Sequence, residues 1–160
     1  MRISSKADYA IRAMAQIATD SRDGPVSAVR IAEQQHIPLK FLQGLLNDLK
    51  RARLVRSKRG PAGGFALWRA PTEITVGDVY RAIDGPLITV GDVRFSEFSY
   101  AGSTAAMAHV WMAARSSLRN VLDKITIADL AAGRLPQVIM DLAEEYRRTV
   151  PDDDRRPATH

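Results

Sequence analysis

The densest chemical feature of this sequence is a run of cations in its first half. Six basic residues fall within ten positions, with no acidic residue among them: Lys50, Arg51, Arg53, Arg56, Lys58 and Arg59. A block of this density can be a solvated surface, and it is also the electrostatic footprint of a site for a polyanion such as nucleic acid. The block by itself leaves both interpretations open.

The net charge of +5 is divided unevenly along the 160 residues. Residues 1–70 contain 13 Lys and Arg against 5 Asp and Glu, a net charge of +8. Residues 71–160 contain 10 Lys and Arg against 13 Asp and Glu, a net charge of −3. The basic excess therefore belongs to the N-terminal half alone.

Other chemistries have little support in the residue types. The sequence has no cysteine, which excludes a disulfide, a thiolate nucleophile and a cysteine-ligated zinc or iron–sulfur cluster. His36, His109 and His160 lack metal-ligand spacing, and no nucleophile–base pair stands at motif spacing. The glycine-rich stretch 60–64 lacks the Lys-Ser/Thr of a phosphate loop. We therefore expect no enzyme, no metal and no cofactor.

Hydrophobic periodicity predicts three short helices in the first 52 residues. The first follows apolar positions from Ala7 to Ala18, and the second begins after an N-cap at Ser27 and ends near Gln35. The third begins at Pro38, which suits the first turn of a helix, and runs to about Ala52. Two short strand patterns follow at 54–57 and 65–68, and the Gly/Pro turn between them predicts a hairpin with a basic tip.

The remaining chain is also helical in pattern. A fourth helix begins at Thr75 with an acidic capping box and ends at Gly85-Pro86, and 87–103 is expected to be loop. A long helix over about 104–124 has a heptad-like apolar seam, which predicts a dimer interface. The seam consists of Met107, Trp111, Ala114, Leu118, Val121 and Ile125. Helices over 127–132 and about 135–146 follow, and 149–160 is expected to be a disordered tail.

Three short helices followed by a basic hairpin form the sequence outline of a winged helix-turn-helix, a mostly α (α+β) fold. In such a fold the third helix enters the major groove of DNA, so Pro38, Leu39, Lys40 and Gln43 stand where base edges or phosphates are met. Amides at the helix N-termini and the Ser27 hydroxyl suit phosphate oxygens. The hairpin reaches an adjacent groove or the DNA backbone.

Several stretches closely resemble a family of bacterial winged-helix regulators, the Rrf-type family that includes IscR, NsrR and CymR. The matching stretches are Met1–Ala10, Gly24–Ser27, Ile37–Leu42 and Leu54–Phe65, and the resemblance extends from residue 1 to about 133. Its most specific part is the wing motif Arg59-Gly60-x-x-Gly63-Gly64. One departure is Arg53, which stands where the family usually has Gly and which either bends this motif or contacts DNA.

The resemblance implies a homodimer in which the long helix crosses that of its partner. Cluster-binding members carry three cysteines in the loop that corresponds to 87–103, and this chain has none there. The run from Val110 to Leu130 is similar to CymR, a member without a cluster that takes its signal through a cysteine-synthesis enzyme. A regulator of cysteine and sulfur metabolism is therefore expected, and the alternative is a winged-helix regulator of another redox or stress regulon that senses a cofactor or small molecule.

These inferences together predict a homodimeric repressor with a pseudo-palindromic operator. Residues 1–85 form the DNA-binding domain, 86–148 form the dimerisation segment, and 149–160 form the tail. Wing contacts are assigned to Arg59 and Gly60. Phosphate contacts are assigned to Arg2, Lys6, Ser27, Arg56 and Lys58.

Three further points accompany that prediction. Neither a secretion signal nor a long apolar stretch occurs, so a cytoplasmic, nucleoid-associated protein without membrane contact is expected. Phe95, Phe98 and Tyr100 must bury against something, either the fold itself or a ligand or partner surface. Met107 and Trp111 suit dimer packing better than an effector pocket, and a winged helix that serves protein assembly instead of DNA binding is a further alternative.

Overall fold

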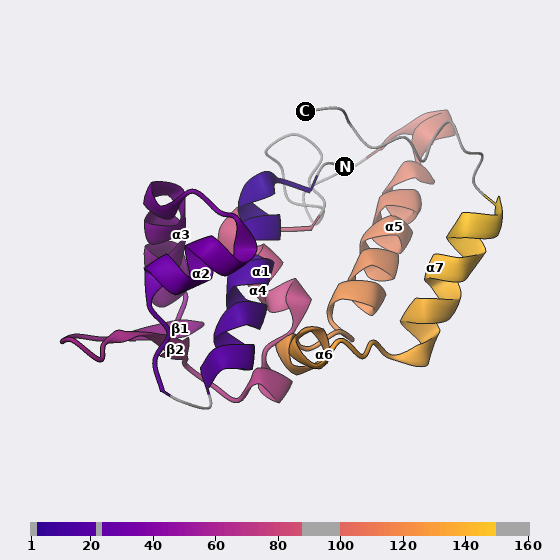
Figure 1. Ribbon diagram of the computed structural model, residues 1–160. Helices are drawn as coiled ribbons and strands as arrows, with labels where there is room; N and C mark the ends of the chain where they lie inside the picture. The colour runs from indigo at the N-terminus through magenta and orange to yellow at the C-terminus, as the bar shows by residue number, and fades with distance from the viewer. Residues whose placement is uncertain (1–2, 22–23, 88–99, 150–160) are drawn as a thin grey trace.

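The computed structural model describes residues 3–21, 24–87 and 100–149. Helix α1 (Ser5–Asp20) lies at the centre of the N-terminal body (Figure 1). Its first turn is capped by Ser4, whose side-chain oxygen accepts a hydrogen bond from the Ala7 N–H at 3.0 Å. The apolar side of α1 is fully buried, as its periodicity predicts, through Ala7, Ala10, Ala13, Met14 and Ile17.

Helices α2 (Ala28–Gln35) and α3 (Leu39–Arg51) pack against α1 and each other. The inner side of α3 is a row of leucines that are almost completely buried: Leu42, Leu45, Leu46 and Leu49. Burying a leucine side chain contributes about 1.5–3 kcal/mol, so this row fixes which side of α3 faces outward. The three helices predicted for the first 52 residues are confirmed.

The wing is an antiparallel pair of strands, β1 (Val55–Lys58) and β2 (Gly64–Leu67). Val55 pairs with Leu67 and Lys58 pairs with Gly64, so both strands are displaced by one residue from the sequence prediction. Leu54 lies outside β1 because its N–H donates to the Leu49 carbonyl of α3 at 2.9 Å. The hairpin is joined to the segment before α2, since the N–H groups of Val26 and Phe65 each donate to the other's carbonyl at 2.8 Å.

Helices α4 (Val76–Asp84) and α6 (Ile127–Ala132) begin side by side. A 3-10 turn, η2 (Pro71–Glu73), leads into α4. Val76 N–H donates to the Ile125 carbonyl and Ile127 N–H donates to the Ile74 carbonyl, both at 2.8 Å. The acidic capping box predicted at Thr75 is confirmed, and Thr126 with Asp129 forms a second one.

The main core crosses the division predicted at residue 85. Ile127 of α6 has no exposed surface and belongs to the same apolar cluster as Met14, Leu46 and Ile74. Leu130 of α6 packs against that cluster too. The domain boundary at residue 85 stays a prediction. The packing shows that α6 shares the apolar core of the N-terminal body.

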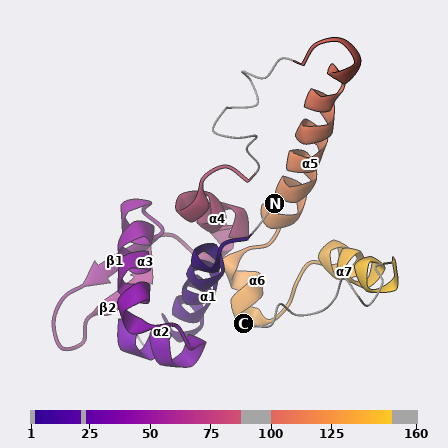
Figure 2. The ribbon, with the colours of Figure 1, turned by 90° about the horizontal axis from the view of Figure 1, so that it is seen from above.

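Helix α5 (Met107–Leu122) follows a 3-10 turn, η4 (Gly102–Thr104), and extends away from the body (Figure 2). None of its residues is buried. Its predicted seam needs one correction: α5 ends at Leu122, and Ile125 lies beyond it in the protomer's own core, where it packs with Val76 and Ile139. Ile125 is 8% exposed, so it is not available as a seam position.

Helix α7 (Gln137–Thr149) ends the described chain. It starts later than predicted, because Pro136 disfavours a helical conformation at Leu135, which lies outside the helix. Ile139 is buried, whereas the other described α7 side chains are exposed. The predicted tail lies outside the described residues, apart from Thr149, the last residue of α7. The fold class is confirmed as mostly helical with one small two-stranded sheet, a winged helix-turn-helix.

Candidate nucleic-acid interface

The outer side of α3 is polar and basic. Because Leu42, Leu45, Leu46 and Leu49 face the core, positions on the opposite side of the helix face solvent. The exposed line at helical spacing consists of Lys40, Gly44, Asn47 and Arg51, and Gln43 is exposed beside it. Amine and amide groups on one helix side can donate to base edges and phosphates, which is the contact type of a recognition helix.

The first turn of α3 presents both free amides and apolar surface. Pro38 is the N-cap and supplies no side-chain hydrogen bond to the first-turn N–H groups. Leu39 is 38% exposed and Phe41 is 43% exposed. The Phe41 ring packs edge-on against Tyr9 of α1, with ring centroids 5.7 Å apart. This turn can therefore meet an anion through its amides and a thymine methyl through its side chains.

The angle between α2 and α3 is held by a network of side chains at the end of α2. His36 adopts a left-handed conformation, with φ 52°, and its N–H bonds to the last turn of α2. The Gln35 amide donates to the Gln16 side-chain oxygen at 2.7 Å, and the Arg12 guanidinium donates to the Gln35 backbone and side-chain oxygens. Arg12 and Gln16 are on α1, so these bonds fix the turn that precedes Pro38 against the central helix.

Ser27 begins α2 and is exposed. Its side-chain oxygen accepts a hydrogen bond from Arg30 N–H at 3.2 Å, which leaves the hydroxyl proton available to an outside acceptor. Arg30 itself is paired with Asp20 at 2.8 Å. The position assigned to a phosphate contact thus combines a hydroxyl donor with a helix N-terminus.

The wing carries exposed cations. Arg56, Lys58 and Arg59 are all exposed, and within the described ranges none of them takes part in an ion pair. At the tip, Gly60 has φ 105° and its carbonyl accepts from Gly63 N–H at 2.9 Å. The tip is therefore a tight turn that holds Arg59 at the far end of the hairpin.

The paired glycines of the wing motif have a structural reason. A Cβ on Gly64 would lie 2.5 Å from the Val26 carbonyl oxygen, and a Cβ on Gly63 would overlap the Lys58 carbonyl oxygen across the hairpin. Contacts this close require the chain to shift. Gly63 lets the turn close, and Gly64 lets the wing lie against the segment that leads into α2.

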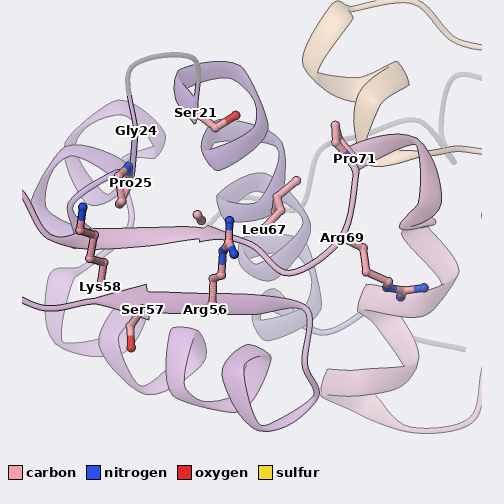
Figure 3. Close-up of a pocket in the computed structure, with 10 residues that line it drawn as sticks. Ser21, Gly24, Pro25, Arg56, Ser57, Lys58, Leu67, Arg69 and Pro71 are labelled. Atoms are coloured by element: carbon pink, nitrogen blue, oxygen red, sulfur yellow. The ribbon is translucent and has the colours of Figure 1, made fainter.

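A basic cavity of about 620 Å³ lies against the sheet (Figure 3). Arg56 and Lys58 extend from β1 across β2, whereas Ser57 points to the opposite side of the sheet (Figure 3). Arg69 also lines the cavity but points away from the other two cations (Figure 3). Among the described residues that line it, three are cations and none is acidic, which is the charge that an anion requires.

Lys6 is not an isolated cation. Its Nζ lies 2.7 Å from the Asp48 carboxylate of α3, which also pairs with Arg51. Hydrogen bonds from Lys6 and then Arg51 hold the pKa of Asp48 below its usual value of 3.8. The acidic group of α3 is thereby neutralised, and Lys6 keeps 45% of its side-chain surface exposed. Arg2, assigned with it to phosphate, lies outside the described residues.

Arg53 adopts the left-handed conformation, with φ 56°. A non-glycine residue there costs about 1 kcal/mol, so the departure from glycine carries a strain. Its N–H donates to the Lys50 carbonyl at 3.0 Å, which closes the end of α3. The side chain is exposed next to the wing.

The interface contains residues that sequence reasoning did not assign. Asn47 and Arg51 continue the outer line of α3, and helical spacing from Lys40 and Gln43 was a signal that could have found them. Phe41 is 43% exposed, and its ring is nearly perpendicular to that of Tyr9, at an interplanar angle of 85°. Arg69 lies beyond the strand pattern and reaches the cavity through the bend after β2, which has no local sequence signature.

The predicted dimer positions within α5 are partly covered. Leu118 packs against the cluster of Ala7, Tyr80 and Leu87, and Val121 packs against the one that contains Ile125. Met107, Trp111 and Ala114 are half-buried. Phe95 and Phe98 lie outside the described residues, and Tyr100 is half-buried.

Two features of the described residues bear on other classes of function. Across residues 3–21, 24–87 and 100–149, His, Asp and Glu side chains form no group of three that could hold a metal ion. No helix in the same residues has the length and apolar character to cross a membrane.

Comparisons with known proteins agree with this geometry. The Rrf2 model, described as an iron-dependent transcriptional regulator, matches residues 3–133. A Mycobacterium tuberculosis protein assigned by name to the HTH-type transcriptional regulators, Rv1287, is 47% identical over 92% of this chain and 91% of its own. The regulator CymR of Bacillus subtilis is 33% identical over 82% of this chain and 91% of its own.

Solved structures give the same result. The structure of CymR, the global cysteine regulator of B. subtilis, superposes with a TM-score of 0.71 and 32% identity, and the match covers 82% of this chain and 97% of CymR. T. potens IscR superposes with a TM-score of 0.64 and 30% identity, over 94% of this chain and 93% of its own. From the match over residues 3–133 and these relatives, the chain belongs to the Rrf2 family of transcriptional regulators, which bind DNA.

Proposed function

We propose that this Rrf2-family regulator is a homodimeric repressor that binds a pseudo-palindromic operator with one α3 helix in each half-site. The observation that carries the proposal is the pairing of an outward polar and basic side on α3 with an exposed basic wing. Both are fixed to one core, α3 by its buried leucines and the wing by the Val26–Phe65 bonds. A rigid body with two cationic elements suits simultaneous contact with a major groove and an adjacent groove or backbone.

Within this proposal the residues divide by type of contact. Lys40 and Gln43 read base edges, because an amine can donate to guanine and an amide can pair with adenine. Pro38 and Leu39 make the close contacts of the first turn. Arg59 and Gly60 form the wing contact, and phosphates are held by Arg2, Lys6, Ser27, Arg56 and Lys58. The exposure of the described members of this set supports these roles.

The test of the interface is Arg59→Ala, measured by fluorescence anisotropy over a range of salt concentrations. We expect binding to weaken by about 1–3 kcal/mol if Arg59 reads a base edge, and the salt slope to fall by about one unit if it holds only a phosphate. Arg134→Ala is the matched control, since Arg134 is an exposed cation between α6 and α7. Unchanged affinity and salt slope for Arg59→Ala would sink the assignment.

The dimer is proposed to form through α5. None of its residues is buried within the protomer, and Met107, Trp111 and Ala114 keep apolar surface exposed along one line. Light scattering should give twice the protomer mass of 17.6 kDa at micromolar concentration. Ala114→Glu should return the mass to that of one protomer, whereas Ser116→Glu, off the seam, should leave the dimer intact. A wild-type mass of one protomer would contradict the seam.

The regulated process is proposed to be cysteine and sulfur metabolism. Two observations support it: the absence of cysteine, which removes the ligands of a cysteine-held cluster, and the similarity to CymR. The signal would come from a cysteine-synthesis enzyme or a small-molecule effector. Sequencing genomic fragments bound with and without cysteine precursors should recover sulfur-assimilation targets. Recovery of redox or stress genes instead would move the protein to another regulon.

A further inference from the structure

The fold of the protomer does not explain why position 44 is a glycine. Of the glycines in the described ranges, six have positive φ: Gly24, Gly60, Gly64, Gly85, Gly102 and Gly133. Gly63 and Gly77 would place a Cβ against another part of the chain, on the Lys58 carbonyl oxygen and on Asp123 respectively. At Gly44 the backbone is ordinary helix, and a Cβ would meet nothing within 4 Å.

The fold gains nothing from this glycine. Glycine in a helix interior is among the least favourable residues, because it loses the most backbone freedom on folding. Gly44 stands in the middle of α3, with five residues of the helix before it and seven after it, and the helix continues through it without interruption. An alanine would therefore fit the position and favour the helix.

The position of Gly44 on α3 offers a functional reason for this loss of helix stability. It lies at the centre of the outer line of α3, four residues after Lys40 and three before Asn47, on the side opposite the buried leucines. A helix with its side chains is about 10–12 Å across, close to the roughly 12 Å width of the major groove. A missing side chain at the outermost point lets the backbone approach the base pairs more closely than any other residue would.

We propose that Gly44 is a specificity-determining residue, whose bare backbone lets α3 lie deep enough in the major groove for Lys40 and Gln43 to reach base edges. The proposal rests on the DNA-binding function proposed above and deepens it. Contacts with phosphates do not need the same depth, because phosphates line the rim of the groove. Gly44 therefore affects binding to a selected sequence more than binding to random duplex.

The experiment uses the full chain and two DNA probes. The first is a random-sequence duplex of about 30 base pairs, and the second is the duplex that the wild-type protein enriches from that pool. Gly44→Ala and Gly44→Gln are compared with Ser116→Ala, which improves helix propensity at an exposed position of α5. Thermal unfolding by circular dichroism and affinity by anisotropy are measured for each.

The two readouts should move in opposite directions. Gly44→Ala should raise Tm by about 2–5 °C and weaken binding to the enriched duplex by about tenfold or more. Gly44→Gln should weaken it further, and both should bind random duplex within about twofold of wild type. Ser116→Ala should keep wild-type affinity for both probes.

Two results would overturn the inference while leaving the proposed function in place. One is wild-type affinity of Gly44→Ala for the enriched duplex, which would make the glycine incidental. The other is a lower Tm for Gly44→Ala, which would make the glycine a requirement of the fold. Failure of the wild-type protein to bind or enrich any duplex would instead overturn the proposed function, and this inference with it.

Discussion

The Lys6 ammonium and the Asp48 carboxylate, 42 positions apart in the chain, form an ion pair with an N–O distance of 2.7 Å. Asp48 is the one acid in the sequence of α3, and Arg51 pairs with the same carboxylate. A negative group on a helix that is proposed to face DNA would repel phosphates. The two cations cancel that charge, but each of them is then shared between Asp48 and any phosphate that approaches.

Asp48→Asn should therefore strengthen DNA binding. The substitution removes a negative charge and releases Lys6 and Arg51, so affinity should rise several-fold and the salt slope should steepen by about one unit. Asp141→Asn makes the same charge change on α7 and should alter neither quantity. Weaker binding by Asp48→Asn would mean that the pair is needed to position Lys6.

Acid should destabilise the protein through Asp48 and Asp129. The Thr126 hydroxyl and then the Thr126 N–H hold the pKa of Asp129 below its usual 3.8, as Lys6 and Arg51 do for Asp48. Because the folded-state pKa is lowered, this stabilisation is present above about pH 4 and is lost as the pH falls through the lowered value. Urea unfolding at pH 7 and pH 3 measures the loss.

Asp129→Ala provides the residue-specific form of this test. Loss of the capping box should cost about 1 kcal/mol at pH 7. The difference from wild type should be smaller at pH 3, because that pH lies below the usual value of 3.8 and part of the stabilisation from the lowered pKa is lost there. An equal difference at both pH values would mean that the charge of the Asp129 carboxylate adds nothing to the free energy of unfolding.

Arg53→Gly should stabilise the fold and weaken DNA binding. Glycine removes the left-handed strain at φ 56°, so the free energy of unfolding should rise by about 0.5–1 kcal/mol. Loss of an exposed cation beside the wing should lower the salt slope by about one unit. Arg53→Lys separates the two effects, because it keeps the charge and the strain; a stability gain there would contradict the explanation.

Gly63→Ala should disable the wing without unfolding the domain. Its Cβ would overlap the Lys58 carbonyl oxygen and lie 2.8 Å from the Gly60 carbonyl oxygen, so the tip would have to open. We expect at least a tenfold loss of DNA affinity with little change in circular dichroism. Ala62→Ser, at the neighbouring exposed tip position, should bind DNA as wild type does. Retained affinity in Gly63→Ala would show that the wing geometry is dispensable.

Local patterns predicted the elements well where one face of each is buried. The apolar spacing of Leu42, Leu45 and Leu49 located α3 and its outward side, and Thr75 with Asp78 located the start of α4. The heptad spacing failed at Ile125, because spacing alone does not distinguish a surface seam from contacts within the protomer.

Long-range relationships could not be predicted from the sequence. No residue near Lys6 indicates that Asp48 is its partner. Likewise, no residue near Ile127 indicates that it completes a core formed by residues more than 50 positions earlier, such as Ile74. Gly44 could be recognised as unusual only once the other glycines had been explained by φ or by close contacts.

The burial of Ile127 bears on how this protein can be divided or recombined. The part of the chain that we propose reads DNA shares its core with α6, which comes after the long helix and packs against α1. A chimera that joined residues 1–85 to a foreign dimerisation helix would expose the apolar surface that Ile127 and Leu130 cover. Transplantation of DNA specificity between such regulators should therefore succeed by exchanging α3 and the wing within an intact chain, and fail by exchanging the N-terminal segment as a block.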